Sequence, residues 1–520
     1  MTVGTGWLRR AVVGALLMAL LCAGAGAGAG AAPASATAPS GDGRWERVDA
    51  YVRDRLDATG TPGAALAVIE KGRVVHRAGF GEDARGEAVT PRTPFLWGSL
   101  AKPVTGMAVL RLVDRGKVEL DAPVRTYLPW FRLADRKASA RITVRQLLTH
   151  TSGIPESATF RISERYDNGP GALTRAVRDL ADVTPSAPPG RSYSYSGAGY
   201  AVLGALVERV SGRPFGDHLR RTVLDPLGMR DAVATERDFR RERVPAGHRQ
   251  IFGRPVSYDA PYDTSGTPYG YLGGSVRDLE RFVLAEMGGG QVDGRRVLSA
   301  RSTALSQRGL VDSSADRYGL GWSVGTLKGT GERMVSHDGG LPGYQSMVVM
   351  LPDSDRAVLV LQNAYQLLDA KRRNDAAFGA ARILSGADPA PVPADTLAVT
   401  LPWAVAGTAA VLLLCAAAPA LRVLPGPRRR ARARSRRRVL TTTSLSVTLA
   451  LLLGAVVWRA LPGAFGGSVP QLLVWMPDVG WSAVAVLVLA PLLAVERLVL
   501  AAVDLRRAGR TRAPLPGATD

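Results

Sequence analysis

The chain has 520 residues, a formal net charge of +21 and two cysteines. It is too long for a single small domain. From residue 422 onward there are 15 arginines and four acidic residues, so about half of the charge excess lies at the C-terminal end, where it indicates contact with anionic lipid rather than nucleic acid. Cys22 and Cys415 fall in apolar segments. The region between them therefore has no disulfide and no thiol nucleophile.

Residues 1–36 are predicted to form an export signal. Two arginines precede an apolar stretch at 11–22, and a small-residue Ala-Ser-Ala sequence ends at residue 36. An uncleaved N-terminal anchor is the alternative, although the apolar stretch is short for a membrane span. Lipidation at Cys22 is disfavoured because two leucines, rather than small residues, precede it.

Residues 45–385 are predicted to fold as one α+β domain. The predicted helices are 49–56, 104–114, 200–210, 278–287 and 368–384, and the predicted strands are 64–70, 74–80, 321–326, 333–336, 344–351 and 357–362. Strands at both ends with a mostly helical insertion between them predict an antiparallel sheet built from the N- and C-terminal strands. The proline- and alanine-rich stretch 386–396 is predicted to be a linker.

The C-terminal part is predicted to cross a membrane. Three apolar stretches, each long enough to span a hydrocarbon core about 30 Å thick, lie at 397–421, 439–461 and 480–503. The loop 422–438 holds nine arginines and no acid, and the tail 504–520 is also basic. Basic segments of this kind mark the cytoplasmic side. The sequence thus predicts three transmembrane helices in the lipid bilayer of the cell membrane, with residues 37–396 on the extracellular side.

Ser99 and Lys102 form a candidate nucleophile and base. The chain has six lysines and 60 arginines, and a buried lysine can lose its proton whereas an arginine cannot. In a helix the positions i and i+3 share one face, so the two side chains can meet. Pro103 suits a first helical turn, and a helix N-terminus there would favour negative charge on the serine oxygen. The alternative is that Ser99 caps the helix and Lys102 is solvated.

Two further segments could complete a site around this pair. Tyr195 lies in a Gly/Ser-rich loop, where a phenol beside an ammonium can share or lose its proton; the alternative is a packing role. His337, Gly339 and Gly340 follow a predicted strand, where glycines allow close approach to the backbone and N–H groups can hold an oxyanion. The alternative for this segment is a tight hairpin turn.

The order and context of these segments resemble the penicillin-recognising serine hydrolases, in particular the branch with class C β-lactamases, D-alanyl-D-alanine carboxypeptidases and related esterases. The resemblance covers about 45–385 and does not include the three apolar stretches. It implies a β-lactamase/transpeptidase-like fold. The matching stretches are 95–102, 142–155 with Leu-Leu-Thr-His-Thr-Ser-Gly at 147–153, 189–212, 225–229, 318–322 and 337–346.

The resemblance also implies roles for individual residues. Ser99 would be the acylated nucleophile, Lys102 the neighbour that helps to remove its proton, and Tyr195 the relay of that proton to the leaving group. Gly197 departs from the pattern, because relatives have asparagine there to help hold the lysine and the amide of the substrate. Losing that amide puts β-lactam and D-Ala-D-Ala turnover in doubt more than acyl transfer itself.

The third segment would supply the oxyanion hole. His337 and Gly339 stand where relatives have Lys-Thr-Gly or His-x-Gly, and the N–H groups of Ser99 and Gly340 would bind the oxyanion. His150 suggests a general base, but in the family its stretch is a structural turn, so no catalytic role is assigned to it. The five histidines are far apart and no cysteine pair accompanies them, so no metal and no cofactor is predicted.

The sequence therefore predicts an exported, membrane-anchored serine hydrolase that forms an acyl-enzyme on an amide or ester, such as a D-Ala-D-Ala peptide or a β-lactam. One alternative is an esterase or D-amino-acid amidase without β-lactam turnover. Another is a non-catalytic sensor that is acylated and signals through the membrane helices. The expected partners are a small-molecule or peptide acyl donor and the bilayer, with no nucleic acid, and the oligomeric state is left open.

Overall fold

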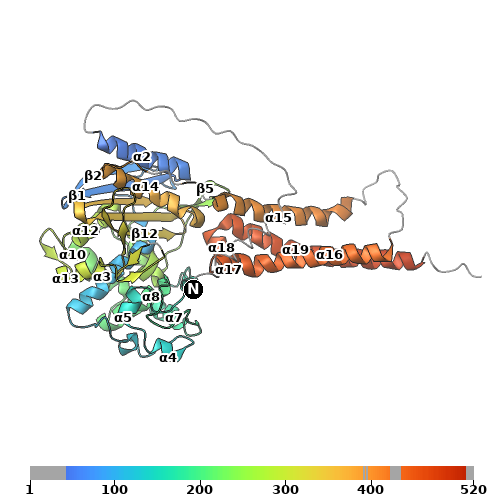
Figure 1. Ribbon diagram of the computed structural model, residues 1–520, viewed down its shortest axis with the longest axis horizontal. Coiled ribbons are helices and arrows are strands. Elements are labelled where there is room, and N and C mark those ends of the chain that lie inside the picture. The colour runs from blue at the N-terminus through green and yellow to red at the C-terminus, as the bar shows by residue number, and fades with distance from the viewer. Residues whose placement is uncertain (1–42, 315, 390–392, 394–395, 422–434, 511–520) are drawn as a thin grey trace, which may run out of the picture. The chain divides into compact units, whose positions relative to one another are not determined.

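The computed structural model describes residues 43–314, 316–389, 393, 396–421 and 435–510. This part of the chain divides into two compact units, a first unit up to residue 393 and a second unit from Thr396 onward, which are described separately (Figure 1). The predicted export signal lies outside the described residues. So do most of the arginine-rich loop, part of the linker and the end of the basic tail.

The first unit is built on an eight-stranded antiparallel sheet with the order β2-β1-β14-β13-β12-β11-β10-β9. Ala64 of β1 pairs with Gln362 of β14, and the pairing continues to Glu70 and Arg356, so strands from the two ends of the unit lie side by side in the sheet. This confirms the predicted α+β fold. The strands are β1 (Gly63–Glu70), β2 (Arg73–Gly81), β9 (Val311–Asp312), β10 (Arg317–Tyr318), β11 (Ser323–Thr326), β12 (Arg333–Leu341), β13 (Tyr344–Leu351) and β14 (Arg356–Gln362).

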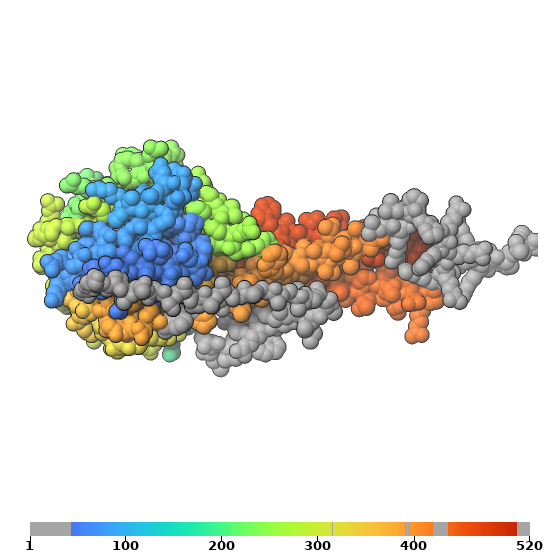
Figure 2. Space-filling view, turned by 90° about the horizontal axis from the view of Figure 1, so that it is seen from above, coloured from blue at the N-terminus to red at the C-terminus, as the bar shows by residue number. Residues whose placement is uncertain are grey.

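Helices cover both faces of this sheet. On one face α2 (Arg44–Thr59) and α14 (Ala370–Leu384) pack against each other, and the N-terminal and C-terminal segments of the unit lie together there (Figures 1 and 2). Successive side chains of a strand point to opposite faces. Leu66 and Val68 of β1 join the cluster under these helices, whereas Ala67 and Ile69 join the larger cluster on the other face. The strand is therefore apolar throughout, as expected where both faces are buried.

The other face carries the helical region that holds the candidate site. α12 (Val276–Met287) packs on β1 and β14, and α3 (Ala101–Asp114) and α8 (Gly197–Ser211) pack against each other (Figure 1). The remaining helices of this region are α4 (Arg136–Ser139), α5 (Val144–Leu148), α6 (Ser157–Ile162), α7 (Ala172–Arg178), α9 (Phe215–Leu219), α10 (Asp225–Leu227), α11 (Glu236–Arg241) and α13 (Ala300–Ser306). Short strands complete the unit, among them β3 (Phe95–Leu96), which pairs with β6 (Gly273–Gly274), and the sheet of β4 (Gly247–Ile251), β5 (Arg254–Tyr258) and β15 (Ala364–Tyr365).

One predicted strand was too short. The strand expected at 333–336 is β12, which runs on through His337 and both glycines to Leu341 and pairs with β13 along its length. Glycine lowers the intrinsic strand preference. Here, however, the segment pairs with the neighbouring strand β13, which satisfies its backbone hydrogen bonds. The tight hairpin turn given as the alternative for the segment 335–344 is present at Pro342 and Gly343, where it joins β12 to β13.

The second unit is helical. It contains α15 (Thr396–Leu421), α16 (Arg436–Ala455), which continues through η8 (Val456–Ala460) into α17 (Leu461–Ala464), α18 (Val469–Trp475) and α19 (Pro477–Arg510). Three of its helical stretches are long and apolar enough to cross a membrane: Thr396–Pro419, Arg436–Ala464 and Pro477–Arg506. Each predicted span falls on one of them. The second unit thus has the composition of a membrane-associated segment.

Candidate active site

Ser99 lies in a tight turn between a short strand and a helix. β3 leads into the 3₁₀ turn η1 (Gly98–Leu100), which runs directly into α3. Trp97, the residue before η1, is fully buried and donates its indole N–H to the carbonyl of Gly274 at 3.0 Å. Lys102 stands in the first turn of α3, and its Nζ lies 2.8 Å from Ser99 Oγ. The i and i+3 spacing thus brings the two side chains together as predicted.

Lys102 is buried beneath the nucleophile. Its Nζ donates to the carbonyl of Tyr269 at 3.0 Å and lies 4.7 Å from the ring centre of Tyr195. Tyr269 belongs to η5 (Thr267–Tyr271), which packs on α3. Burial lowers the pKa of Lys102 to about 7, and two nearby carboxylates oppose this shift only in part. A large fraction of the amine is therefore neutral near pH 7, as a proton acceptor requires.

Tyr195 is the second residue that contacts the nucleophile. It lies in the loop before α8 and shares a hydrogen bond with Ser99. Burial raises the pKa of Tyr195 well above its ordinary value, and the Ser99 hydrogen bond opposes this effect. The phenol therefore keeps its proton at neutral pH. It can donate that proton to a nearby oxygen, and the neutral amine of Lys102 can accept one.

His150 holds the loop of Tyr195 from both sides, a role that no local sequence pattern indicates. Its carbonyl accepts the N–H of Ser194 at 2.8 Å, and its Nδ1 accepts the N–H of Ser196 at 3.1 Å. Its ring centre lies 4.4 Å from that of Tyr195, and its backbone has the uncommon φ of +57°. Burial keeps the pKa of His150 well below its ordinary value. The neutral ring positions Tyr195 and does not reach the nucleophile through any hydrogen bond of the described chain.

His337 is a neutral hydrogen-bonding residue of the site. Its Nδ1 lies 2.6 Å from the carbonyl of Asp338 and must therefore carry the proton, so Nε2 accepts the hydroxyl of Tyr318 at 3.1 Å. Burial lowers the pKa of His337 to about 4. At neutral pH the ring supplies no positive charge beside the substrate position. Tyr318, which ends β10, belongs to one of the matching stretches, but its position alone did not mark it as a site residue.

Gly339 and Gly340 lie directly against the nucleophile turn. A Cβ on Gly339 would come within 1.9 Å of the carbonyl oxygen of Trp97, and one on Gly98 within 2.6 Å of the nitrogen of Gly340. Gly98 also has a φ of +57°. The hydroxyl of Ser346 on β13 donates to the same Trp97 carbonyl at 2.6 Å. The glycines are thus needed where β12 meets the Ser99 turn, and this contact brings the backbones of Ser99 and Gly340 close together.

The space at Gly197 is filled by two neighbours. A Cβ at this position would lie 2.7 Å from Cγ2 of Thr159 and 3.0 Å from the ring of Tyr269. The Thr159 hydroxyl accepts the N–H groups of Gly197 at 2.8 Å and of Ala198 at 3.3 Å, and so caps α8. The glycine therefore leaves room for Thr159 and Tyr269. The carbonyl of Tyr269 in turn accepts a hydrogen bond from Lys102.

Two carboxylates give the site a negative field. Asp338 is exposed next to His337 on β12 and accepts a hydrogen bond from Asn374 at 3.2 Å, and Glu156 precedes α6. Both carboxylates act to raise the pKa of Lys102, against the larger effect of burial. Among the residues that the structure describes, no group of three or more His, Cys, Asp or Glu side chains is placed to hold a metal ion.

Comparison with known proteins identifies relatives of the first unit. The family model described as Beta-lactamase matches residues 48–382. Penicillin-binding protein 4 of Amycolatopsis lactamdurans is 34% identical over 331 residues, which cover 60% of this chain and 85% of the relative. Protein flp of Staphylococcus aureus (strain COL) is 24% identical over 61% of this chain, and the match spans 63% of its own length.

Solved structures show the same fold. An octameric penicillin-binding protein homologue from Pyrococcus abyssi is 25% identical with a TM-score of 0.57, covering 66% of this chain and 78% of that one. A D-stereospecific amidohydrolase from Streptomyces sp. is 24% identical with a TM-score of 0.50, covering 63% and 98%.

Proposed function

Because this chain belongs to the beta-lactamase family, we propose that it is a membrane-anchored serine hydrolase that forms an acyl-enzyme at Ser99 and acts on an amide or ester outside the cell. The observation that carries the proposal is the distance of 2.8 Å between Ser99 Oγ and a buried amine whose pKa is lowered to about 7. A serine becomes a useful nucleophile when a neighbouring base can take its proton.

In the proposed reaction the neutral amine of Lys102 takes the proton as Ser99 Oγ attacks the carbonyl carbon. The negative charge that forms on the carbonyl oxygen is held by the N–H groups of Ser99 and Gly340. Tyr195 gives its phenolic proton to the leaving group and is reprotonated by the Lys102 ammonium. Water then attacks the acyl ester with the same groups as base and acid, and the serine is restored.

Intact-mass analysis of the full chain tests this proposal. We expect a covalent adduct after exposure to an activated ester or to a penicillin, and its absence in Ser99→Ala. Ser211→Ala, which changes a serine at the far end of α8, is the matched control and should keep the adduct. If neither reagent gives an adduct on the folded protein, the mechanism is wrong.

The negative field of the site favours one substrate class within this reaction. The carboxylates of Asp338 and Glu156 both act to raise the pKa of Lys102. His337 is neutral, whereas a relative with the Lys-Thr-Gly sequence has a positive charge at that position. A substrate with a free amino group suits this field better than one with a terminal carboxylate. This supports the second candidate function, an amidase or esterase for amine-bearing substrates.

Parallel assays separate the two candidate functions. A chromogenic cephalosporin and a D-Ala-D-Ala peptide carry carboxylates, whereas a D-amino-acid p-nitroanilide carries a free amine. Faster turnover of the anilide, with a loss of that preference in Asp338→Asn, supports the second candidate. Preferred turnover of the carboxylates would contradict it. The sensor alternative predicts an adduct that persists, so release of the acyl group within minutes would count against it.

A further inference from the structure

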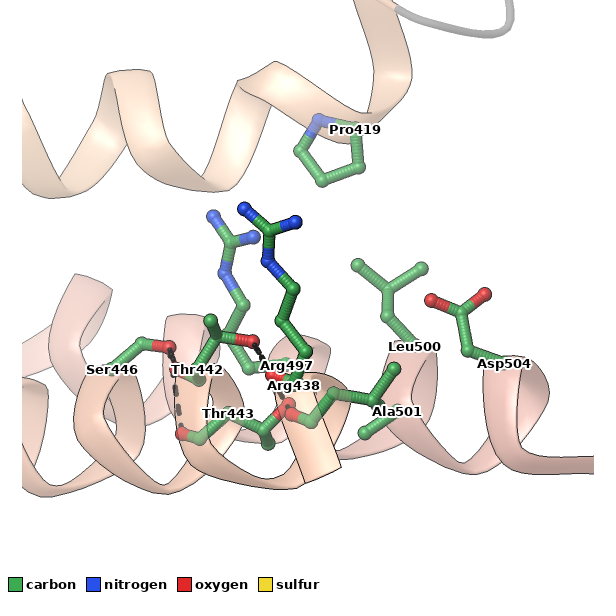
Figure 3. Close-up of a pocket in the computed structure, with 10 residues that line it drawn as sticks. Pro419, Arg438, Thr442, Thr443, Ser446, Arg497, Leu500, Ala501 and Asp504 are labelled. Atoms are coloured by element: carbon green, nitrogen blue, oxygen red, sulfur yellow. Dashed lines mark hydrogen bonds between the residues drawn. The ribbon is translucent and has the colours of Figure 1, made fainter. Parts of the chain in front are cut away.

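The second unit contains a basic cavity at one end of its helices. Its volume is about 510 Å³ (Figure 3). It is lined by residues of α15, α16 and α19, namely Pro419, Arg438, Val439, Thr442, Thr443, Ser446, Arg497, Leu500, Ala501 and Asp504. None of these residues belongs to the serine site, and the proposed hydrolase function does not use them.

Two guanidinium groups point into the basic cavity. Figure 3 shows the side chains of Arg438 on α16 and Arg497 on α19 directed toward Pro419 on α15. Arg497 donates to the carbonyl of Cys415 at 2.6 Å. Proline lacks an N–H, so Pro419 leaves this carbonyl, four residues earlier in α15, without its usual helical partner.

Within the described part of the chain, the two guanidinium groups make a single hydrogen bond, the one from Arg497 to Cys415. Arg497 keeps a buried Nε without a hydrogen-bond partner, and no ion pair joins either arginine to Asp504 among the residues that the structure describes. A guanidinium has five N–H donors in a fork that matches a phosphate. Uncompensated positive charge beside hydrocarbon is costly, so the cavity favours an anionic occupant.

The α16 wall of the cavity also supplies oxygen acceptors. The hydroxyl of Thr442 donates to the carbonyl of Arg438 at 2.8 Å, and that of Ser446 donates to the carbonyl of Thr442. Their protons are committed to the helix backbone, and both residues line the cavity, so their oxygens keep lone pairs that can accept hydrogen bonds. These lone pairs suit the hydroxyl groups of an alcohol such as glycerol.

The position of the cavity along the chain places it at a membrane surface. It lies where α15 ends, where α16 begins and in the last turns of α19. The sequence between α15 and α16 holds the arginine-rich stretch, and the positive-inside rule puts this end at the cytoplasmic leaflet, where anionic lipids gather. Farther along α16, Leu445, Leu449 and Leu452 are exposed and can contact acyl chains.

We propose that the basic cavity binds the phosphodiester headgroup of an anionic phospholipid. Arg438 and Arg497 contact the phosphate, and the hydroxyl groups of a glycerol headgroup meet the acceptors on α16. The bound lipid compensates the two charges and joins α15, α16 and α19 at the membrane surface.

Native mass spectrometry of the full chain in neutral detergent tests this site with two probes, phosphatidylglycerol and phosphatidylcholine of the same chain length. We expect phosphatidylglycerol to remain bound in preference to phosphatidylcholine. Arg438→Gln should weaken its retention by about fivefold to tenfold. Arg437→Gln makes the same charge change one residue earlier, outside the cavity lining, and should weaken it by less than twofold. Equal binding of the two lipids, or equal losses in the two variants, would overturn the proposal.

A competition arm distinguishes a lipid from a free phosphate. Glycerol phosphate, which carries the same headgroup chemistry without acyl chains, should fail to displace phosphatidylglycerol at millimolar concentration. Displacement would mean that the cavity binds a soluble phosphate instead, and the lipid proposal would be wrong. The comparison of the two lipids on the unaltered protein needs no variant, so it decides the matter even if Arg438→Gln does not fold.

Discussion

Lys102 in the first unit and Arg438 and Arg497 in the second unit are cationic side chains with partly apolar surroundings, but they differ in whether the charge can be removed. Burial lowers the pKa of Lys102 to about 7, so this group alternates between amine and ammonium. A guanidinium stays charged in any protein environment. In the proposed reaction a rare lysine stands where a proton moves, and in the proposed lipid site two arginines supply a permanent charge.

The largest expected effect comes from removing the proton acceptor. Lys102→Met keeps the apolar stem and lacks the amine, so acylation of Ser99 should fall by about 10²- to 10⁴-fold. Lys102→Arg should be equally slow, because its guanidinium cannot take the proton. The rates are measured as adduct formation with an activated ester.

Lys117→Met is the matched control, because Lys117 is exposed in the turn that follows α3. Its acylation rate should equal that of the unaltered chain, and thermal unfolding should show that all three variants fold. A Lys102→Arg variant that acylates at an undiminished rate would break the contrast between the two units.

A smaller kinetic effect is expected at His150, which acts through Tyr195. His150→Leu removes the acceptor for the Ser196 N–H and puts a branched side chain at positive φ, so kcat should fall by about tenfold with little change in KM. His150→Asn should restore part of the rate, because asparagine offers an oxygen acceptor and tolerates positive φ.

Asp355→Leu serves as the control for His150 because Asp355 has a φ of +50° in a surface turn far from Tyr195 along the chain. It should lower the unfolding temperature without changing kcat. If His150→Leu also changes only the unfolding temperature, the histidine is structural and does not position the tyrosine.

The smallest effect concerns stability at the departure from the family pattern. Gly197→Asn should lower the free energy of unfolding by about 1–3 kcal/mol, because its Cβ would overlap Thr159. Thr159→Ser removes the overlapping methyl group and keeps the capping hydroxyl. Added to Gly197→Asn, it should therefore offset much of the loss of stability. Gly212→Asn, at the open C-terminal end of the same helix, is the control. Chemical denaturation gives the free energy of unfolding of the unaltered chain, Gly197→Asn, Gly197→Asn with Thr159→Ser, and Gly212→Asn. If Gly197→Asn leaves this free energy unchanged, the space at Gly197 is not filled.

The sequence was sufficient for the fold because the strands at both ends of the first unit are apolar runs with clear boundaries. It was also sufficient for the Ser99 and Lys102 pair, since a spacing of three residues determines which helix face they share. It was insufficient for the second half of β12, because glycines disfavour a strand there. Only the pairing with β13 extends the strand through them. The roles of His150 and Thr159 depend on contacts with residues 46 and 38 positions away, and no local pattern specifies such contacts.

The pH dependence of Ser99 acylation tests the central claim most directly. With a neutral activated ester, the acylation rate should rise about tenfold per pH unit in acid and level off above a midpoint near 7, where Lys102 loses its proton. The sign follows from the base being the deprotonated amine, so activity is lost as the pH falls. A rate that stays constant from about two pH units below that midpoint to about two pH units above it would contradict the account.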